Sequence, residues 1–88
     1  MRLYFDTNSA TEDGCYWLSL AGTLRDLELL GIELEAGMAV TLYTDDPDEA
    51  GCPALLLVDA VVEKDGAHFV ARADKRTWRH EKLQDGAV

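Results

Sequence analysis

The dipeptide Asp65-Gly66 constrains this chain more than any other feature of its 88 residues. It joins two strand-like apolar runs in ALLLVDAVVEKDGAHFVARAD, and it suits the positive backbone angles of a two-residue type I′ turn. The pattern therefore predicts a β-hairpin. Counted back from that turn, the register pairs Lys64 with Ala67, Glu63 with His68, Val62 with Phe69, Val61 with Val70, Ala60 with Ala71, Asp59 with Arg72 and Val58 with Ala73.

The two faces of this hairpin differ in polarity. Because side chains alternate between the faces of a strand, one face is expected to be wholly apolar: Val58, Ala60, Val62, Phe69, Ala71 and Ala73. The other face would carry two charged or potentially charged pairs, Asp59 with Arg72 and Glu63 with His68. A slip of one residue would mix the faces, so pattern and turn favour the same hairpin.

The sequence also predicts one short helix at about 23–30. Thr23 followed by Asp26 has the spacing of a capping box. Leucines recur there at helical spacing: Leu24, Leu27 and Leu30. Gly31 stands where a left-handed residue would end the helix, and Ile32 just after it could close back on Leu27.

Further strands are expected at about 2–6, 15–20, 38–44 and 77–80. Short loops and the lack of strand-helix alternation favour a mainly β (α+β) fold. We expect a small antiparallel, SH3-like bent sheet or barrel of about five strands, with the helix plugging one end. The alternative is an open antiparallel sheet with the helix across one face. Residues 1–82 would form a single domain, and 83–88 a frayed tail.

Charge limits the partners that the chain can bind. With 8 basic and 17 acidic side chains its formal charge is -9, which argues against nucleic acid. Residues 66–88 carry 5 basic and 3 acidic side chains, so we expect this segment to lie against the acidic body; a partner-binding patch is the alternative. No apolar run approaches the roughly 18 residues of a membrane span. With two cysteines and no signal-peptide pattern, we expect a reducing cytoplasm.

The most acidic stretch, YTDDPDEAGCP, begins like a calcium-binding loop. Aligned from Asp46 it matches an EF-hand loop at the first, third and sixth positions, but Ala50 and Leu57 lack the ligands of the fifth and twelfth. Strands rather than helices flank it. We therefore expect a solvated strand connection. The alternative is a weak Ca²⁺ or Mg²⁺ site formed by four carboxylates: Asp45, Asp46, Asp48 and Glu49.

No pattern predicts catalysis. The serines and cysteines lie in no nucleophile motif, and no glycine-rich phosphate loop occurs. The four candidate zinc ligands, Cys15, Cys52, His68 and His80, lack paired spacing. A barrel of this size also has little room for a ligand pocket of roughly 300 Å³ or more. We therefore expect no enzyme and no cofactor.

Two tryptophans could belong either to the core or to a contact surface. Trp17 alternates with Tyr16 and Leu18, so it or they must point away from the core. Trp78 lies in KRTWRH, where it could cover an open barrel end with an arginine stacked on it. Core or lid packing is one interpretation. The other is an interaction surface made of Trp17, Trp78, Arg76 and Arg79.

Three segments, GIELEAGMAVTLYTDD, PALLLVDAVVEKDG and TWRH, resemble a group of small acidic bacterial proteins of unknown function. The resemblance covers most of the chain and implies a bacterial cytosolic origin, with no catalytic or binding residues to carry over. We expect a non-catalytic protein-interaction or accessory module that presents an acidic surface and could self-associate through a strand edge. The alternatives are weak divalent-cation binding at residues 45–49 and an acidic decoy for basic nucleic-acid-binding surfaces.

Overall fold

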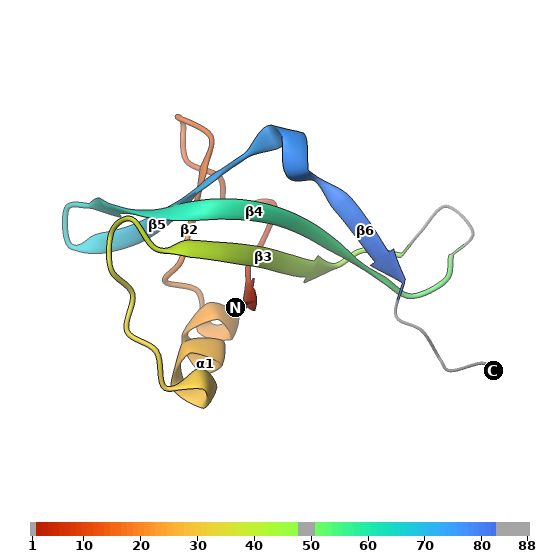
Figure 1. The fold of residues 1–88 in the computed structure, drawn as a ribbon, viewed down its shortest axis with the longest axis horizontal. Coiled ribbons are helices and arrows are strands. Elements are labelled where there is room, and N and C mark those ends of the chain that lie inside the picture. Colours follow the sequence, from red (N-terminus) through yellow and green to blue (C-terminus); the bar gives the residue numbers. More distant parts are fainter. Residues whose placement is uncertain (1, 48–50, 83–88) are drawn as a thin grey trace.

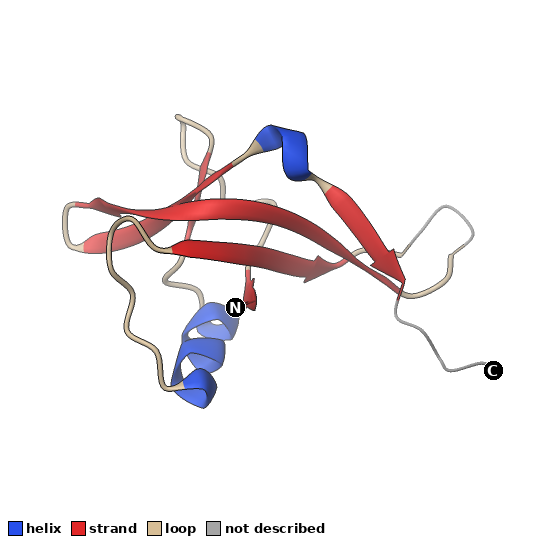
Figure 2. Ribbon diagram, in the orientation of Figure 1, coloured by secondary structure: helices blue, strands red, loops and turns tan. Residues whose placement is uncertain are grey.

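The computed structural model describes residues 2–47 and 51–82, which form a six-stranded sheet with one α-helix and a short 3-10 helix (Figures 1 and 2). The elements are β1 Arg2–Tyr4, β2 Cys15–Trp17, α1 Ala21–Leu30, β3 Ala39–Asp45, β4 Ala54–Asp65, β5 His68–Ala73, η1 Lys75–Thr77 and β6 Arg79–Lys82. The mainly β class with one helix is confirmed. The predicted tail at 83–88 lies outside the described residues. Within the described part, no helix is long and apolar enough to cross a membrane.

The long strand β4 is the central strand of the sheet and pairs with three other strands. β3 pairs antiparallel along one edge of β4. Along the opposite edge, β5 and β6 each pair antiparallel with a different part of β4 (Figure 1). The main strand order is β1-β3-β4-β5-β2. The sheet ends at β1 and β2 without joining them, so it is open rather than closed into a barrel.

One pairing departs from the antiparallel sheet that the sequence predicts. β1 pairs with β3 in parallel, with Leu3 opposite Leu42. Parallel neighbours need a long crossover, and here the chain passes through β2 and α1 before β3 returns beside β1. The sequence predicts antiparallel pairing, and this crossover gives no local sequence signal.

The β4–β5 hairpin exists, but its register differs from the predicted one by two residues. Asp65 lies opposite His68, and the two central turn residues are Gly66 and Ala67 rather than Asp65 and Gly66. Gly66 has φ 62°, in the left-handed region that favours glycine. Since side chains repeat every two residues along a strand, this shift keeps the predicted faces and changes only the cross-strand partners. The predicted pairs Asp59–Arg72 and Glu63–His68 are therefore wrong.

The predicted apolar face of the hairpin forms the centre of the core. Nine buried residues make one cluster: Leu3, Phe5, Leu18, Val40, Leu42, Val58, Ala60, Val62 and Ala71. Tyr16 and Trp78 pack against it, each with its ring centroid within 6.3 Å of an aromatic neighbour. Aromatic pairs at these separations add to the burial of apolar area. The core thus draws on β1 through β5 and on the residue that precedes β6.

Helix α1 covers the outer edge of β1. The helix starts after Leu20 with no side-chain cap, so the predicted capping box is wrong. Thr23 is fully buried instead, and its hydroxyl donates to the Tyr4 carbonyl oxygen at 2.6 Å. Asp26 accepts from the Tyr4 backbone N–H at 2.9 Å. Three residues apart on one helix face, the two side chains satisfy both backbone groups of Tyr4.

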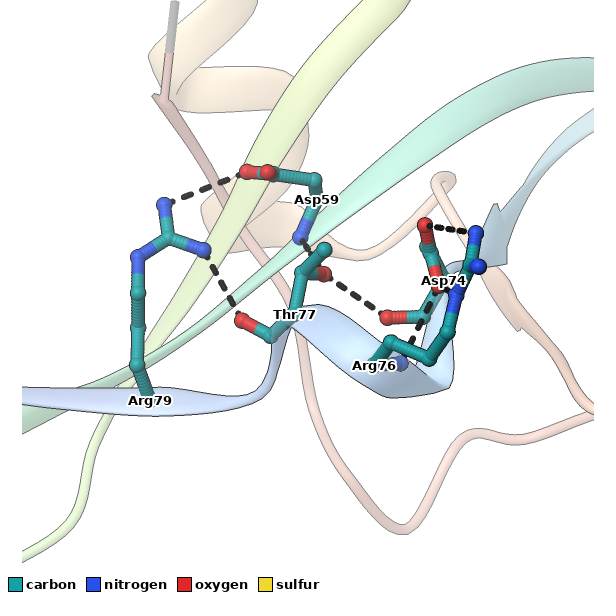
Figure 3. A network of polar contacts seen from close by, with 5 residues as sticks. All are labelled: Asp59, Asp74, Arg76, Thr77 and Arg79. Atoms are coloured by element: carbon teal, nitrogen blue, oxygen red, sulfur yellow. Dashed lines mark hydrogen bonds and ion pairs between the residues drawn. The ribbon is translucent and has the colours of Figure 1, made fainter.

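A polar network fills the interruption between β5 and β6 (Figure 3). On the side of β4 away from β3, no strand of the described residues pairs with Asp59, whose backbone N–H donates to the Thr77 hydroxyl at 2.9 Å. Asp74 donates its backbone N–H to the Asp59 carbonyl at 2.8 Å, and its own carbonyl accepts from Thr77 at 2.7 Å. η1 therefore supplies the hydrogen bonds that a continuous strand would have made.

Candidate protein-interaction groove

An apolar groove of about 480 Å³ lies between α1, the segment after it and the tip of the β4–β5 hairpin. Its apolar lining comes from all three parts: Leu24 and Leu27, Ile32 and Leu34, Ala67 and Phe69. Leu18 also lines the groove and is only 1% exposed, so the groove reaches the core. The expectation that this chain has little room for a pocket of roughly 300 Å³ is wrong, because the sheet stays open at this end.

The sequence builds the helical wall of the groove with simple local rules. Leu24 and Leu27 lie three residues apart and so face the same side of α1. Gly31 has φ 67° and ends the helix, as predicted, and the Ile32 N–H donates to the Leu27 carbonyl at 3.0 Å. This reversal brings Ile32 and Leu34 into the lining.

Three of the four leucines of helix α1 are more than half exposed to solvent. Leu24, which lines the groove, is 52% exposed, while Leu30 is 51% and Leu29 78% exposed. Single exposed leucines are ordinary, but exposed apolar side chains that adjoin an apolar groove mark a contact surface. Leu24 meets that condition, whereas Leu29 is not part of the lining.

The charge around the groove is negative. Glu33 is the one charged side chain among its lining residues, apart from the titratable His68. Two segments build most of it, residues 24–35 and 64–69. The Asp26 carboxylate is bonded to Tyr4 and Tyr43, and the remaining four carboxylates still outnumber the two basic residues: Glu28, Glu33, Glu35 and Asp65 against Arg25 and Lys64. The Lys64 ammonium lies 5.8 Å from the centre of the Phe69 ring. The surroundings of the groove therefore favour a positively charged partner.

Trp17 lies outside the groove lining and contacts one lining residue of the hairpin, His68. It is half-buried on the sheet face opposite the core, across from Val70, while its neighbours Tyr16 and Leu18 point inward. Its ring meets the ring of His68 edge to face, with centroids 5.8 Å apart. His68 thus packs on Trp17 and not on Glu63, and Trp17 supports a lining residue of the groove.

The other three residues of the predicted interaction surface lie around η1. Trp78 packs against the core, 6.0 Å from Phe5 between ring centroids. The predicted arginine stacking is replaced by ion pairs: Arg76 binds Asp74 at 3.2 Å and Arg79 binds Asp59 at 3.1 Å (Figure 3). Of the two predicted tryptophans, Trp17 therefore lies on the sheet face opposite the core, whereas Trp78 packs against the core.

A second groove, of about 490 Å³, crosses the sheet face opposite the core. Its three charged lining residues already have partners within the chain. Asp59 binds Thr41 and Arg79, Arg72 binds Glu63, and Asp74 binds Arg76. Only Val61, 45% exposed, offers a large apolar contact there. This groove is more polar and less suited to a hydrophobic partner than the groove beside α1.

The acidic loop connects two strands, as predicted. β3 ends at Asp45, β4 begins at Ala54, and the Asp46 carboxylate lies 2.8 Å from Nε2 of His80 on β6. The other two predicted metal ligands, Asp48 and Glu49, lie outside the described residues. Within residues 2–47 and 51–82, no group of three or more His, Cys, Asp or Glu side chains is arranged to hold a metal ion.

Among the described residues of the basic C-terminal segment, Arg72 and Arg79 pair with the acidic body as the charge distribution predicts, whereas Arg76 pairs with Asp74 inside the segment. Arg72 contacts Glu63 at 2.7 Å and Asp13 at 4.0 Å, and its hydrogen bond lowers the pKa of the exposed Glu63 carboxyl. Burial raises the pKa of the neighbouring Cys15 thiol, against the opposing effect of Arg72. A thiol with a raised pKa is a poor nucleophile, so Cys15 fits a structural role.

Sequence reasoning missed the groove, although one signal was present. Four of the ten residues of α1 are leucines, more than the single face of a short helix can bury. Comparisons with protein-family models, curated proteins and solved structures find no match to this chain.

Proposed function

We propose that this chain is a non-catalytic protein-interaction module whose contact surface is the groove between α1 and the β4–β5 hairpin. The observation that carries the proposal is the half-exposed Leu24 beside an apolar groove that reaches the buried Leu18. Burying a whole leucine stabilises a complex by roughly 1.5–3 kcal/mol, so covering the exposed half of Leu24 contributes about 1 kcal/mol. Further contacts with Ile32 and Phe69 add to this.

The chemistry of the lining supports binding over catalysis. Only Ser19, Glu33 and His68 carry nucleophilic or acid-base groups there, and the His68 ring is packed on Trp17. Apolar linings with few polar groups suit contact with apolar side chains of a partner. The buried Cys15 thiol is compatible with the reducing cytoplasm that we propose as its compartment.

A quantitative pull-down from the source cell tests this function with three baits: the natural chain, Leu24→Asp and Leu29→Asp. The second variant is a matched control, because Leu29 is on the same helix and more exposed but outside the groove lining. We expect a defined set of proteins captured by the natural chain and by Leu29→Asp, and lost with Leu24→Asp. Equal capture by all three baits would refute the groove as the contact surface.

A further inference from the structure

We propose that the occupant of the groove is a short amphipathic helix of a partner protein, apolar on one face and flanked by lysine or arginine. This inference rests on the proposed function and specifies the class of its partner. Three properties of the described residues lead to it: the charge around the groove, the state of the sheet edges beside it, and the shape of the lining.

Charge selects a basic partner over a second copy of the chain. Apart from Asp26, which is bonded to Tyr4 and Tyr43, four carboxylates and two basic residues lie in the segments 24–35 and 64–69, and the whole chain carries -9. A second copy would bring another -9 to the same contact, and like charges at an interface oppose association. Lysines and arginines of a partner would instead meet Glu33 in the groove lining, next to which Glu35 follows in the chain.

The sheet edges near the groove do not favour strand addition. On β1, both backbone groups of Tyr4 are already bonded to Thr23 and Asp26. On β2, the Trp17 N–H donates to the Ser9 carbonyl at 3.3 Å, and the Cys15 carbonyl accepts from the backbone of the preceding loop at 2.6 Å. A partner strand would have to displace these bonds, so recognition here relies on side chains.

The shape of the lining suits a helix. A helix that lies in a groove inserts side chains spaced three and four residues apart, and needs no backbone hydrogen bonds from the groove. The leucines of α1 and the hairpin tip at Phe69 supply apolar surface from separate elements, with Leu18 beneath. A flat or polar ligand would leave this apolar lining in water.

The test uses the full isotope-labelled chain, NMR titration and three synthetic 14-residue peptides. The first has leucine on one helical face and lysine on the other. The second replaces its leucines by serine, and the third replaces its lysines by glutamate. We expect saturable shifts of the backbone amides of Leu24, Leu27 and Phe69 with the first peptide only, and weaker binding at higher salt.

Two variants of the chain separate groove binding from general charge attraction. Leu24→Ser is expected to lower the affinity for the first peptide roughly fivefold, because the variant loses the burial of half a leucine side chain. The control Leu29→Ser is expected to leave its affinity within about twofold. The amide spectrum of each free variant shows that its fold is intact.

Several results would overturn the proposal. If the serine peptide binds as tightly as the first peptide, charge alone accounts for the binding and the apolar lining contributes nothing. If the glutamate peptide binds more tightly than the first, the partner is acidic and not basic. A Leu24-dependent dimer in sedimentation would make a second copy the occupant. If no peptide binds but the pull-down still depends on Leu24, the partner class is wrong and the proposed function stands. A pull-down independent of Leu24 refutes the function itself.

Discussion

The hydrogen bond from Thr23 to Tyr4 gives the sharpest stability prediction. Thr23 is fully buried, and its hydroxyl is the donor to the Tyr4 carbonyl at 2.6 Å. Thr23→Val keeps the shape of the side chain but replaces this donor with a methyl group. Leaving a buried acceptor without its partner costs roughly 1–3 kcal/mol, and a methyl group cannot approach the oxygen as closely as a hydroxyl.

For a domain of this size, 1 kcal/mol lowers Tm by roughly 4–8 °C, so Thr23→Val should melt about 4–24 °C below the natural chain. Thermal unfolding followed by circular dichroism, with urea unfolding at 25 °C, measures the change. Thr23→Ser keeps the donor and loses one buried methyl, so we expect a loss of about 1 kcal/mol or less.

Thr7→Val is the matched control for the substitution itself. Thr7 is exposed in the turn that follows β1, so the same exchange there should leave Tm within about 2 °C. If Thr23→Val melts together with this control, the bond to Tyr4 contributes nothing. The account of how α1 is held against β1 would then be wrong.

Three further predictions test other elements. In Gly22→Ala the new Cβ would meet Cδ2 of Tyr4 at 2.6 Å, so the variant should unfold at lower urea even though alanine favours helices by about 1 kcal/mol; an increase in stability would contradict this packing. The hydrogen bond to Asp26, with burial, raises the pKa of Tyr43 to about 12. The folded state therefore holds this proton longer than the unfolded chain, so the associated stability is present below pH 10 and is lost between about pH 10 and 12. Urea unfolding at pH 9 and 11.5 should show a larger loss for the natural chain than for Tyr43→Phe, and equal losses would refute it. Gly66→Val should destabilise the hairpin because φ is 62° there, and an unchanged urea midpoint would mean that the turn is wrong.

The hairpin shows what the sequence could and could not specify. Alternation fixed which side chains face the core, and Val58, Ala60 and Val62 are buried as predicted. The dipeptide Asp65-Gly66 fits a turn either as its two central residues or shifted by one position. The two choices move the register by two residues and leave both faces unchanged, so the apolar pattern cannot distinguish them.

The pair Thr23 and Asp26 illustrates an ambiguity of a different kind. Hydroxyl and carboxylate side chains at this spacing can cap a helix from within or reach out to another backbone. Local propensity favours the cap, but Tyr4 presents two backbone groups at the edge of β1 that would otherwise lack partners. The tertiary requirement prevails, and it depends on a parallel crossover that no short stretch of sequence reveals.

The coverage of the sheet edges also bears on how this chain can bind anything. The sequence predicted self-association through a strand edge, and this stays a prediction for β6, whose residues Arg79–Lys82 are all exposed. Charged side chains along an edge strand oppose pairing with another strand. At β1 both backbone groups of Tyr4 are bonded to α1, and at β2 the Trp17 N–H and the Cys15 carbonyl are bonded to the loop before β2. Because the helix that closes the β1 edge also turns Leu24 toward the hairpin tip, closing that edge and forming the groove depend on the same element. Detaching α1 should therefore expose a strand edge and abolish the groove together, which makes Thr23→Val a test of binding as well as of stability.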